Sequence, residues 1–196
     1  MGIKINFGSG QRPFGLPRTS EAECVICGQN KTHHSSVSHG YVPSAPDAWV
    51  NIDCQERWKP DVTDLRAIPD DSAEVIISHH QIEHVELSAA DDLIRDWHRC
   101  LQTGGSLLVF VPDMRAIATA WIEGRIDDYI FSVNTWGAWM GDASADIHRW
   151  GYWGPSLKKK LNAACKWSAV RPFDWRDIPG ADLARDWWIL AVEAVK

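Results

Sequence analysis

Two features of the N-terminal third have the residue types that bind a nucleotide-like ligand. Gly8-Ser9-Gly10 follows the alternating stretch 4–7, which predicts a strand that enters a tight turn. Gly8 and Gly10 lack a Cβ atom, so their backbone amides can approach a charged ligand closely. Asp53 lies at the end of the strand-like stretch 49–53, where a carboxylate suits ribose hydroxyls. The third glycine of the dinucleotide fingerprint is missing, and a plain strand-to-loop turn is the alternative.

A second group of residues has the spacing of a metal site. Cys24 and Cys27 form a C-x2-C pair, and His34 and His39 follow as H-x4-H. This pattern predicts one structural Zn²⁺ with four ligands, and His33 is an alternative to His34. The two pairs are too close together for the recognition helix of a DNA-reading zinc finger. A polar surface loop with incidental cysteines and a redox-active C-x-x-C pair remain open as alternatives.

A third motif, His80-Gln81-Ile82-Glu83-His84, matches the H-x-x-E-H pattern of inverted zinc peptidases. That chemistry needs His80 and His84 on one helical face, with Glu83 as the base. Here the stretch follows an apolar strand and precedes a helix that we expect to begin at Ser88. We therefore predict a loop at the end of a strand, and the peptidase is the minor hypothesis.

Length, charge and cysteine content restrict the class of protein. The chain has 196 residues, of which 45% are hydrophobic and 23% charged, as in a single globular domain. We expect one domain over residues 1–196, with an inserted Cys/His-rich module at 15–47. The net charge of −6 argues against nucleic-acid binding. Five cysteines, an odd number, do not suggest a disulfide framework. Because no apolar run is long enough for a membrane span and no signal peptide is evident, we expect a cytoplasmic protein.

Strand-like and helical stretches alternate along the chain, which favours an α/β fold with helices on both faces of a parallel sheet. A helix capped by Ser88 is expected to end at Gly104-Gly105, and another is expected to begin at Pro155. Residues 114–150 read as helical and rich in tryptophan. We expect seven strands, the last two forming an antiparallel edge, in the segments 4–7, 49–53, 62–65, 73–78, 106–111, 167–170 and 187–195.

The order of six motifs resembles that of class I S-adenosylmethionine-dependent methyltransferases, over about 150 residues that exclude the insertion. The motifs are Ile5–Gly10, Trp49–Asp53, Asp61–Leu65 with Ile68–Ser72, Val75–His84, Leu101–Leu107 and Val111–Asp113. The resemblance implies a Rossmann-like, seven-stranded, mostly parallel sheet with an antiparallel last strand. It also implies that S-adenosylmethionine is the cofactor and that the reaction is methyl transfer.

Carried over by position, the resemblance gives roles to individual residues. Gly8, Ser9 and Gly10 would pass under the methionine part of the cofactor, and Asp53 would hold the ribose. Further cofactor contacts would come from Asp64 and Leu65 beside the adenine and from Ser78 at the site of methyl transfer. If the acceptor needs a base, the candidates are His79, His80, Asp113 and His148.

The sequence leaves the acceptor and one competing function open. Trp136, Trp139, Trp150 and Trp153 crowd one region, where they either pack in the core or form an aromatic wall for a sugar or another small-molecule acceptor. The function expected is methyl transfer to a hydroxyl or amine of such an acceptor. The alternative is a catalytically degenerate methyltransferase fold that binds a protein partner through its zinc module.

Overall fold

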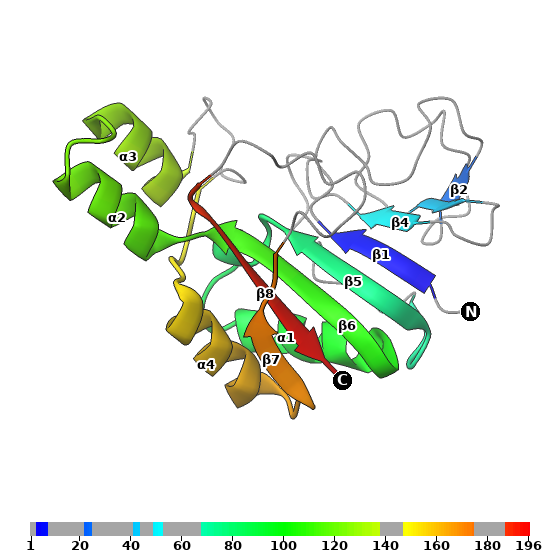
Figure 1. Ribbon diagram of the computed structural model, residues 1–196. Coiled ribbons are helices and arrows are strands. Elements are labelled where there is room, and N and C mark those ends of the chain that lie inside the picture. The colour runs from blue at the N-terminus through cyan, green and yellow to red at the C-terminus, as the bar shows by residue number, and fades with distance from the viewer. Residues whose placement is uncertain are drawn as a thin grey trace.

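One mixed sheet organises the molecule. The computed structural model describes residues 68–137, 147–174 and 187–196 in full, together with the backbone of the strands at 3–7, 22–24, 41–43 and 49–52. Within these residues, eight strands form a sheet in the order β2-β3-β4-β1-β5-β6-β8-β7 (Figure 1). The strands are Ile3–Phe7 (β1), Ala22–Cys24 (β2), Tyr41–Pro43 (β3), Trp49–Ile52 (β4), Ala73–His79 (β5), Leu101–Pro112 (β6), Ala169–Pro172 (β7) and Ile189–Val195 (β8).

The sheet is parallel in its centre and antiparallel at both edges. The strands β4, β1, β5 and β6 run parallel, whereas β2, β3 and β4 pair antiparallel, as do β6, β8 and β7. The expected α/β fold with an antiparallel last strand is therefore confirmed. The expectation of seven mostly parallel strands differs from this sheet, because two short strands, β2 and β3, form within the inserted segment 15–47, where we expected none. The expected strand at 62–65 lies outside the described residues.

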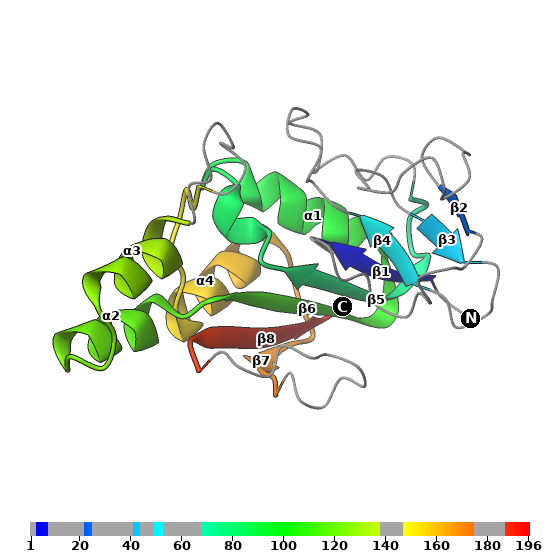
Figure 2. The same cartoon turned by 90° about the horizontal axis from the view of Figure 1, so that it is seen from above.

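The helices that pack on the sheet in the described residues cover one face. They are α1 (Ala90–Cys100) and α4 (Gly154–Ala164), which lie on the same side of the sheet in Figure 2. Ile76 of β5 packs in the large core under these helices, and the next residue, Ile77, packs in a small cluster on the opposite face. The expectation of helices on both faces is thus not met by the described residues. Because β5 packs on both faces of the sheet, its central residues, Val75 to Ile77, are all apolar.

The helix α1 begins and ends differently from the expectation. Ala89, not Ser88, is its N-cap, and no side chain caps it. The backbone N–H groups of Ala89 and Ala90 instead donate to the carbonyl oxygen of Glu86, at 2.9 and 3.0 Å. The chain therefore enters the helix through a backbone turn, which a capping pattern in the sequence does not reveal.

The Gly104-Gly105 pair does not end α1 but lies inside β6, where the register with β5 shifts. Gly104 has a φ of +81°, which suits glycine. A Cβ atom on Gly105 would lie 2.9 Å from the carbonyl oxygen of Gln102 and 3.0 Å from those of Ala73 and Glu74. The glycines thus allow β6 to begin immediately after α1, at Leu101.

We predict that Gly105→Ala destabilises the protein, because a methyl group there would overlap with three backbone oxygens. Overpacking of this kind costs about 1–3 kcal/mol. Gly154→Ala is the matched control, since its Cβ would lie 3.9 Å from Leu190 in an ordinary contact, and alanine favours the helix. Urea denaturation of the two variants and the wild type measures the difference. Equal stability of the Gly105 and Gly154 variants would contradict the prediction.

Two further helices extend beyond the carboxyl end of β6. They are α2 (Met114–Ile122) and α3 (Asp128–Trp136), which lie side by side at that end of the sheet in both views (Figures 1 and 2). No helix of the described chain is both long and apolar enough to cross a membrane.

Candidate functional site

The carboxyl ends of three parallel strands meet at one edge of the sheet. Phe7, the last residue of β1, pairs with Ile52, the last residue of β4, and with Ser78 of β5 on its other side. The strand order reverses at β1, because β4 lies on one side of β1 and the next strand in the sequence, β5, lies on the other side. In open α/β sheets, ligands bind at such a reversal, outside the carboxyl ends of the strands.

Most of the predicted cofactor and zinc residues lie outside the described residues. They are Gly8, Ser9, Gly10, Asp53, Asp64 and Leu65 for the cofactor, and Cys27, His34 and His39 for zinc. Cys24 is the last residue of β2, where its backbone pairs with Tyr41 of β3.

The end of β5 carries a buried hydroxyl and two histidines. Ser78 is fully buried, and its Oγ has no hydrogen-bond partner among the described residues. His79 ends the strand and contacts His80 edge to face, with ring centroids 4.7 Å apart. His80 has a φ of +48°, and its backbone N–H donates to the carbonyl oxygen of Phe110 in β6. The strand therefore turns sharply just after the position predicted for methyl transfer.

Glu83 is a buried carboxylate in the short 3-10 helix η3 (Ile82–His84). Its Oε1 accepts a hydrogen bond from Nδ1 of His80 at 3.0 Å, while Oε2 is buried with no partner among the described residues. Burial raises the pKa of Glu83, but the hydrogen bond and the charge of His80, with the charge of His84, outweigh it and hold the pKa below its usual value. Glu83 is therefore an ionised carboxylate at neutral pH.

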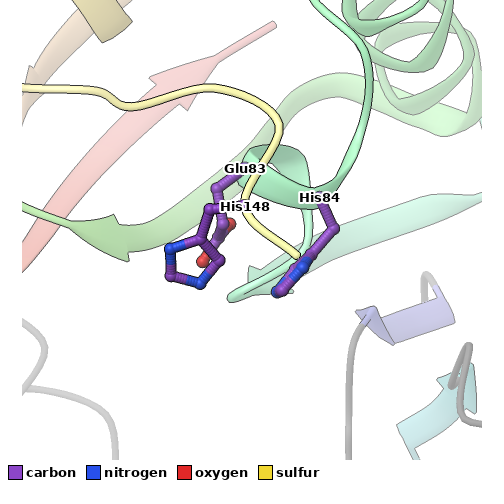
Figure 3. Close-up of side chains that lie close together, drawn as sticks. All are labelled: Glu83, His84 and His148. Atoms are coloured by element: carbon purple, nitrogen blue, oxygen red, sulfur yellow. The ribbon is translucent and has the colours of Figure 1, made fainter. Parts of the chain in front are cut away.

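His148 lies against this turn. The backbone N–H groups of Arg149 and Trp150 donate to the carbonyl oxygen of Glu83, at 2.7 and 3.1 Å, and fix residues 147–150 to η3. The His148 and His84 rings meet with centroids 4.9 Å apart, beside the Glu83 carboxylate (Figure 3). Burial, followed by the charge of His84, lowers the pKa of His148. This ring is therefore neutral at neutral pH.

The structure brings His79 and His148 of the predicted catalytic residues to the same turn, through His80 and Glu83. Asp113 has a different, structural role. Its Oδ1 accepts hydrogen bonds from the backbone N–H groups of Arg115 and Ala116, at 3.0 and 3.2 Å, and caps α2. A carboxylate held in this way stabilises the first turn of the helix.

The described tryptophans of the predicted cluster are exposed. Trp136, Trp150 and Trp153 have 58%, 44% and 39% of their surface exposed, so the interpretation as core packing is wrong for them. Trp139 lies outside the described residues. Arg115 lies over the Trp153 ring, 5.5 Å from its centroid.

Sequence reasoning missed the joint position of Glu83, His84 and His148. The H-x-x-E-H motif is the available signal, but by itself it indicates a loop at the end of a strand and, as the minor hypothesis, a peptidase. The expected loop at the end of a strand is confirmed, since the motif spans a left-handed residue and a single 3-10 turn, not the interior of an α-helix. The partner from residue 148 comes from a segment far along the chain, which no local pattern indicates.

Two comparisons with known proteins returned matches. A family model described as a methyltransferase domain matches residues 44–109. A solved S-adenosylmethionine-dependent methyltransferase from Archaeoglobus fulgidus is 12% identical, with a TM-score of 0.54, over 100% of this chain and 87% of that one. Human N-acetylserotonin methyltransferase, solved with S-adenosylmethionine, is 11% identical with a TM-score of 0.44, over 78% of this chain and 35% of that one.

The extent of these matches varies. The chain spans 33%, 43% and 32% of the length of three other solved proteins that it matches. A search of curated proteins returned no match. The archaeal structure shows the fold, and the family model shows the methyltransferase sequence pattern from β4 to β6.

Proposed function

We propose that the chain is an active class I S-adenosylmethionine-dependent methyltransferase for a small acceptor, which the family match over residues 44–109 and the fold shared with the archaeal methyltransferase support. The observation that carries the proposal is the register of Phe7 with Ile52 and Ser78. It makes the strand ends that precede Gly8 and Asp53 neighbours of the end of β5. The family match and the fold give no support to the alternative of a degenerate protein-binding module.

The residues proposed for the cofactor follow these strand ends. Gly8, Ser9 and Gly10 continue from β1 and Asp53 from β4, and Asp64 and Leu65 would flank the adenine. The buried Oγ of Ser78, without a partner among the described residues, is a polar group at the same edge that a ligand could satisfy. S-adenosylmethionine, when bound, supplies an electrophilic methyl group on its sulfonium sulfur.

The protein must hold the acceptor in line with that methyl group. If the acceptor is a hydroxyl or a cationic amine, a side chain must also accept its proton. His79 and His148 are the proposed bases, since both lie at the turn after β5. Asp113 is a weaker candidate, because its Oδ1 already caps α2. The exposed rings of Trp150 and Trp153 suit the face of a sugar or another small-molecule acceptor.

Two further parts of the proposal rest on the sequence. The Cys/His-rich module at 15–47 would hold a structural Zn²⁺, and the net charge of −6 disfavours nucleic acid as acceptor. A cytoplasmic location stays a prediction.

We predict that Asp53→Ala weakens the binding of S-adenosylhomocysteine at least about tenfold. A carboxylate that accepts hydrogen bonds from ribose hydroxyls contributes roughly 1.5–3 kcal/mol, and 1.4 kcal/mol corresponds to a tenfold change. Isothermal titration calorimetry measures the change. Asp92→Ala is the control, since Asp92 is an exposed residue of α1 that pairs with Arg95. Unchanged affinity of the Asp53 variant would remove this residue from the site.

Catalysis itself is tested by the formation of S-adenosylhomocysteine from S-adenosylmethionine in the presence of hydroxyl- and amine-bearing sugars and small molecules. Product formed only when an acceptor is present supports the proposal. Tight cofactor binding without turnover on any acceptor class would favour the binding module instead.

A further inference from the structure

Glu83, His84 and His148 form a cluster of ligand-type side chains that methyl transfer does not require. One potential ligand atom from each residue lies within 4.8 Å of the other two. The three side chains gather at one place, although His148 comes from a segment 64 positions beyond His84 (Figure 3). Two imidazoles and one carboxylate are the ligands of a common type of zinc site in proteins.

The His84 ring is oriented for this role. Its Nδ1 lies 3.1 Å from the carbonyl oxygen of Ile147. A carbonyl oxygen only accepts hydrogen bonds, so Nδ1 must carry the proton. In the neutral ring, the lone pair is then on Nε2. Histidines that bind metals ordinarily have their second nitrogen fixed by a carbonyl or carboxylate in this way.

The position of His148 is fixed through its backbone. Its backbone N–H donates to the carbonyl oxygen of Trp136 at 3.0 Å. The backbone bonds from Arg149 and Trp150 to Glu83 fix this segment beside η3, so that the distance between the two histidines does not depend on the metal.

The Glu83 carboxylate is a second, independent observation that points to a bound cation. Its side chain is 1% exposed, and Oε1 is held by His80 at 3.0 Å. Oε2 is buried and has no partner among the described residues. A buried carboxylate oxygen without a partner costs free energy, and a cation between it and the two histidines would remove that cost. His80 then has the role of an outer group that positions the carboxylate.

We propose that Glu83, His84 and His148 bind one divalent transition-metal ion of the Zn²⁺ class. Two nitrogen ligands disfavour Mg²⁺ and Ca²⁺, which prefer oxygen ligands. Three protein ligands leave at least one coordination position open for water or for an oxygen of another molecule. The site differs from the predicted cysteine site, whose four ligands would leave none. With its lone pair on the metal, His148 could not serve as a base, and His79 would be the remaining histidine candidate.

The test is a Co²⁺ titration of the full chain, after removal of metals with a chelator. Cys24→Ser with Cys27→Ser is the parent protein, so that the predicted thiolate site does not contribute. We expect one Co²⁺ per chain, with visible d–d absorption and no thiolate charge-transfer band, and competition by Zn²⁺. If this parent does not fold, the wild type is titrated, and the absence or presence of the thiolate band separates the two sites.

Four variants and a control locate the ion. Loss of an outer partner typically weakens metal binding 10–100-fold, so we expect that range for His80→Ala and about 100-fold or more for His84→Ala, His148→Ala and Glu83→Gln. His98→Ala is the control, because His98 hydrogen-bonds with Lys166 and packs on Trp167. Circular dichroism verifies folding, and Zn²⁺ should raise the thermal midpoint of the parent but not of the His84 and His148 variants.

Two results would overturn the proposal. One is a parent protein that binds no Co²⁺ while remaining folded, and the other is unchanged affinity in both the His84 and the His148 variant. Neither result depends on cofactor binding, so the proposal can fail while the methyltransferase assignment holds, and the reverse is also possible.

Discussion

Replacing Gly10 by valine should abolish the binding of S-adenosylhomocysteine. Gly10 is the second glycine after β1, whose last residue, Phe7, lies between the ends of β4 and β5. A cofactor bound at this edge would pass directly against the backbone there, in the space that a branched side chain would fill. Valine also resists a positive φ. We therefore expect no measurable binding by calorimetry.

The control for Gly10→Val is a glycine substitution away from the site. Gly124 lies between α2 and α3 with a φ of +69°, and a Cβ added there meets nothing within 4 Å. Gly124→Val should lower stability by about 1–2 kcal/mol through backbone strain alone and keep cofactor binding. If Gly10→Val binds the cofactor as the wild type does, this loop does not contact it, whereas loss of binding in both variants would indicate a general defect in folding.

The parts of the fold that the sequence predicted well are those with continuous or periodic apolar residues. The stretch 75–77 is apolar because Ile76 and Ile77 pack into clusters on opposite faces of the sheet. Leu157 and Leu161 are buried on one face of α4, as their spacing indicates. In each case the burial of the residue and its local pattern have the same cause, so the pattern is informative.

The sequence is less informative where backbone geometry determines the ends of helices and strands. Gly104 and Gly105 were interpreted as the end of a helix, but they form an irregular start of β6, where three carbonyl oxygens crowd Gly105. The start of α1 is fixed by hydrogen bonds to the Glu86 carbonyl and not by the Ser88 side chain. Glycine signals that the backbone is unusual, but it does not say which unusual conformation forms.

The sequence predicts which types of residue form the candidate site, but it does not predict which of them lie next to one another. His148 was expected to be functional, yet its neighbours Glu83 and His84 are set by long-range backbone bonds from Arg149 and Trp150. Asp113 was expected to be a base from its position at the end of β6. The same position makes it the N-cap of α2, because a strand that leads directly into a helix leaves N–H groups that need an acceptor.

Removal of the predicted cysteine ligands Cys24 and Cys27 should strongly destabilise the inserted module at 15–47. The rest of the domain should keep its stability. The short strands β2 and β3 pair antiparallel, and Cys24 lies opposite Tyr41. Residues 25–40, which include Cys27, His34 and His39, connect these two strands in the sequence. This segment is mostly polar, and ordering a backbone costs about 1 kcal/mol or more per residue, which the burial of its few apolar side chains would not offset. Zinc in small modules of this kind contributes on the order of 10 kcal/mol.

Elemental analysis of the purified wild type and of Cys24→Ser with Cys27→Ser measures this prediction. We expect the double variant to lose one zinc per chain and limited proteolysis to cleave its module much faster, while the circular dichroism of the remaining domain changes little. His84→Ala is the matched control, because it removes a histidine ligand from the other proposed site and should keep the zinc bound by the cysteines. A double variant that retains all of its zinc would exclude the cysteine site, and the Glu83, His84 and His148 cluster would then be the place to look for the metal.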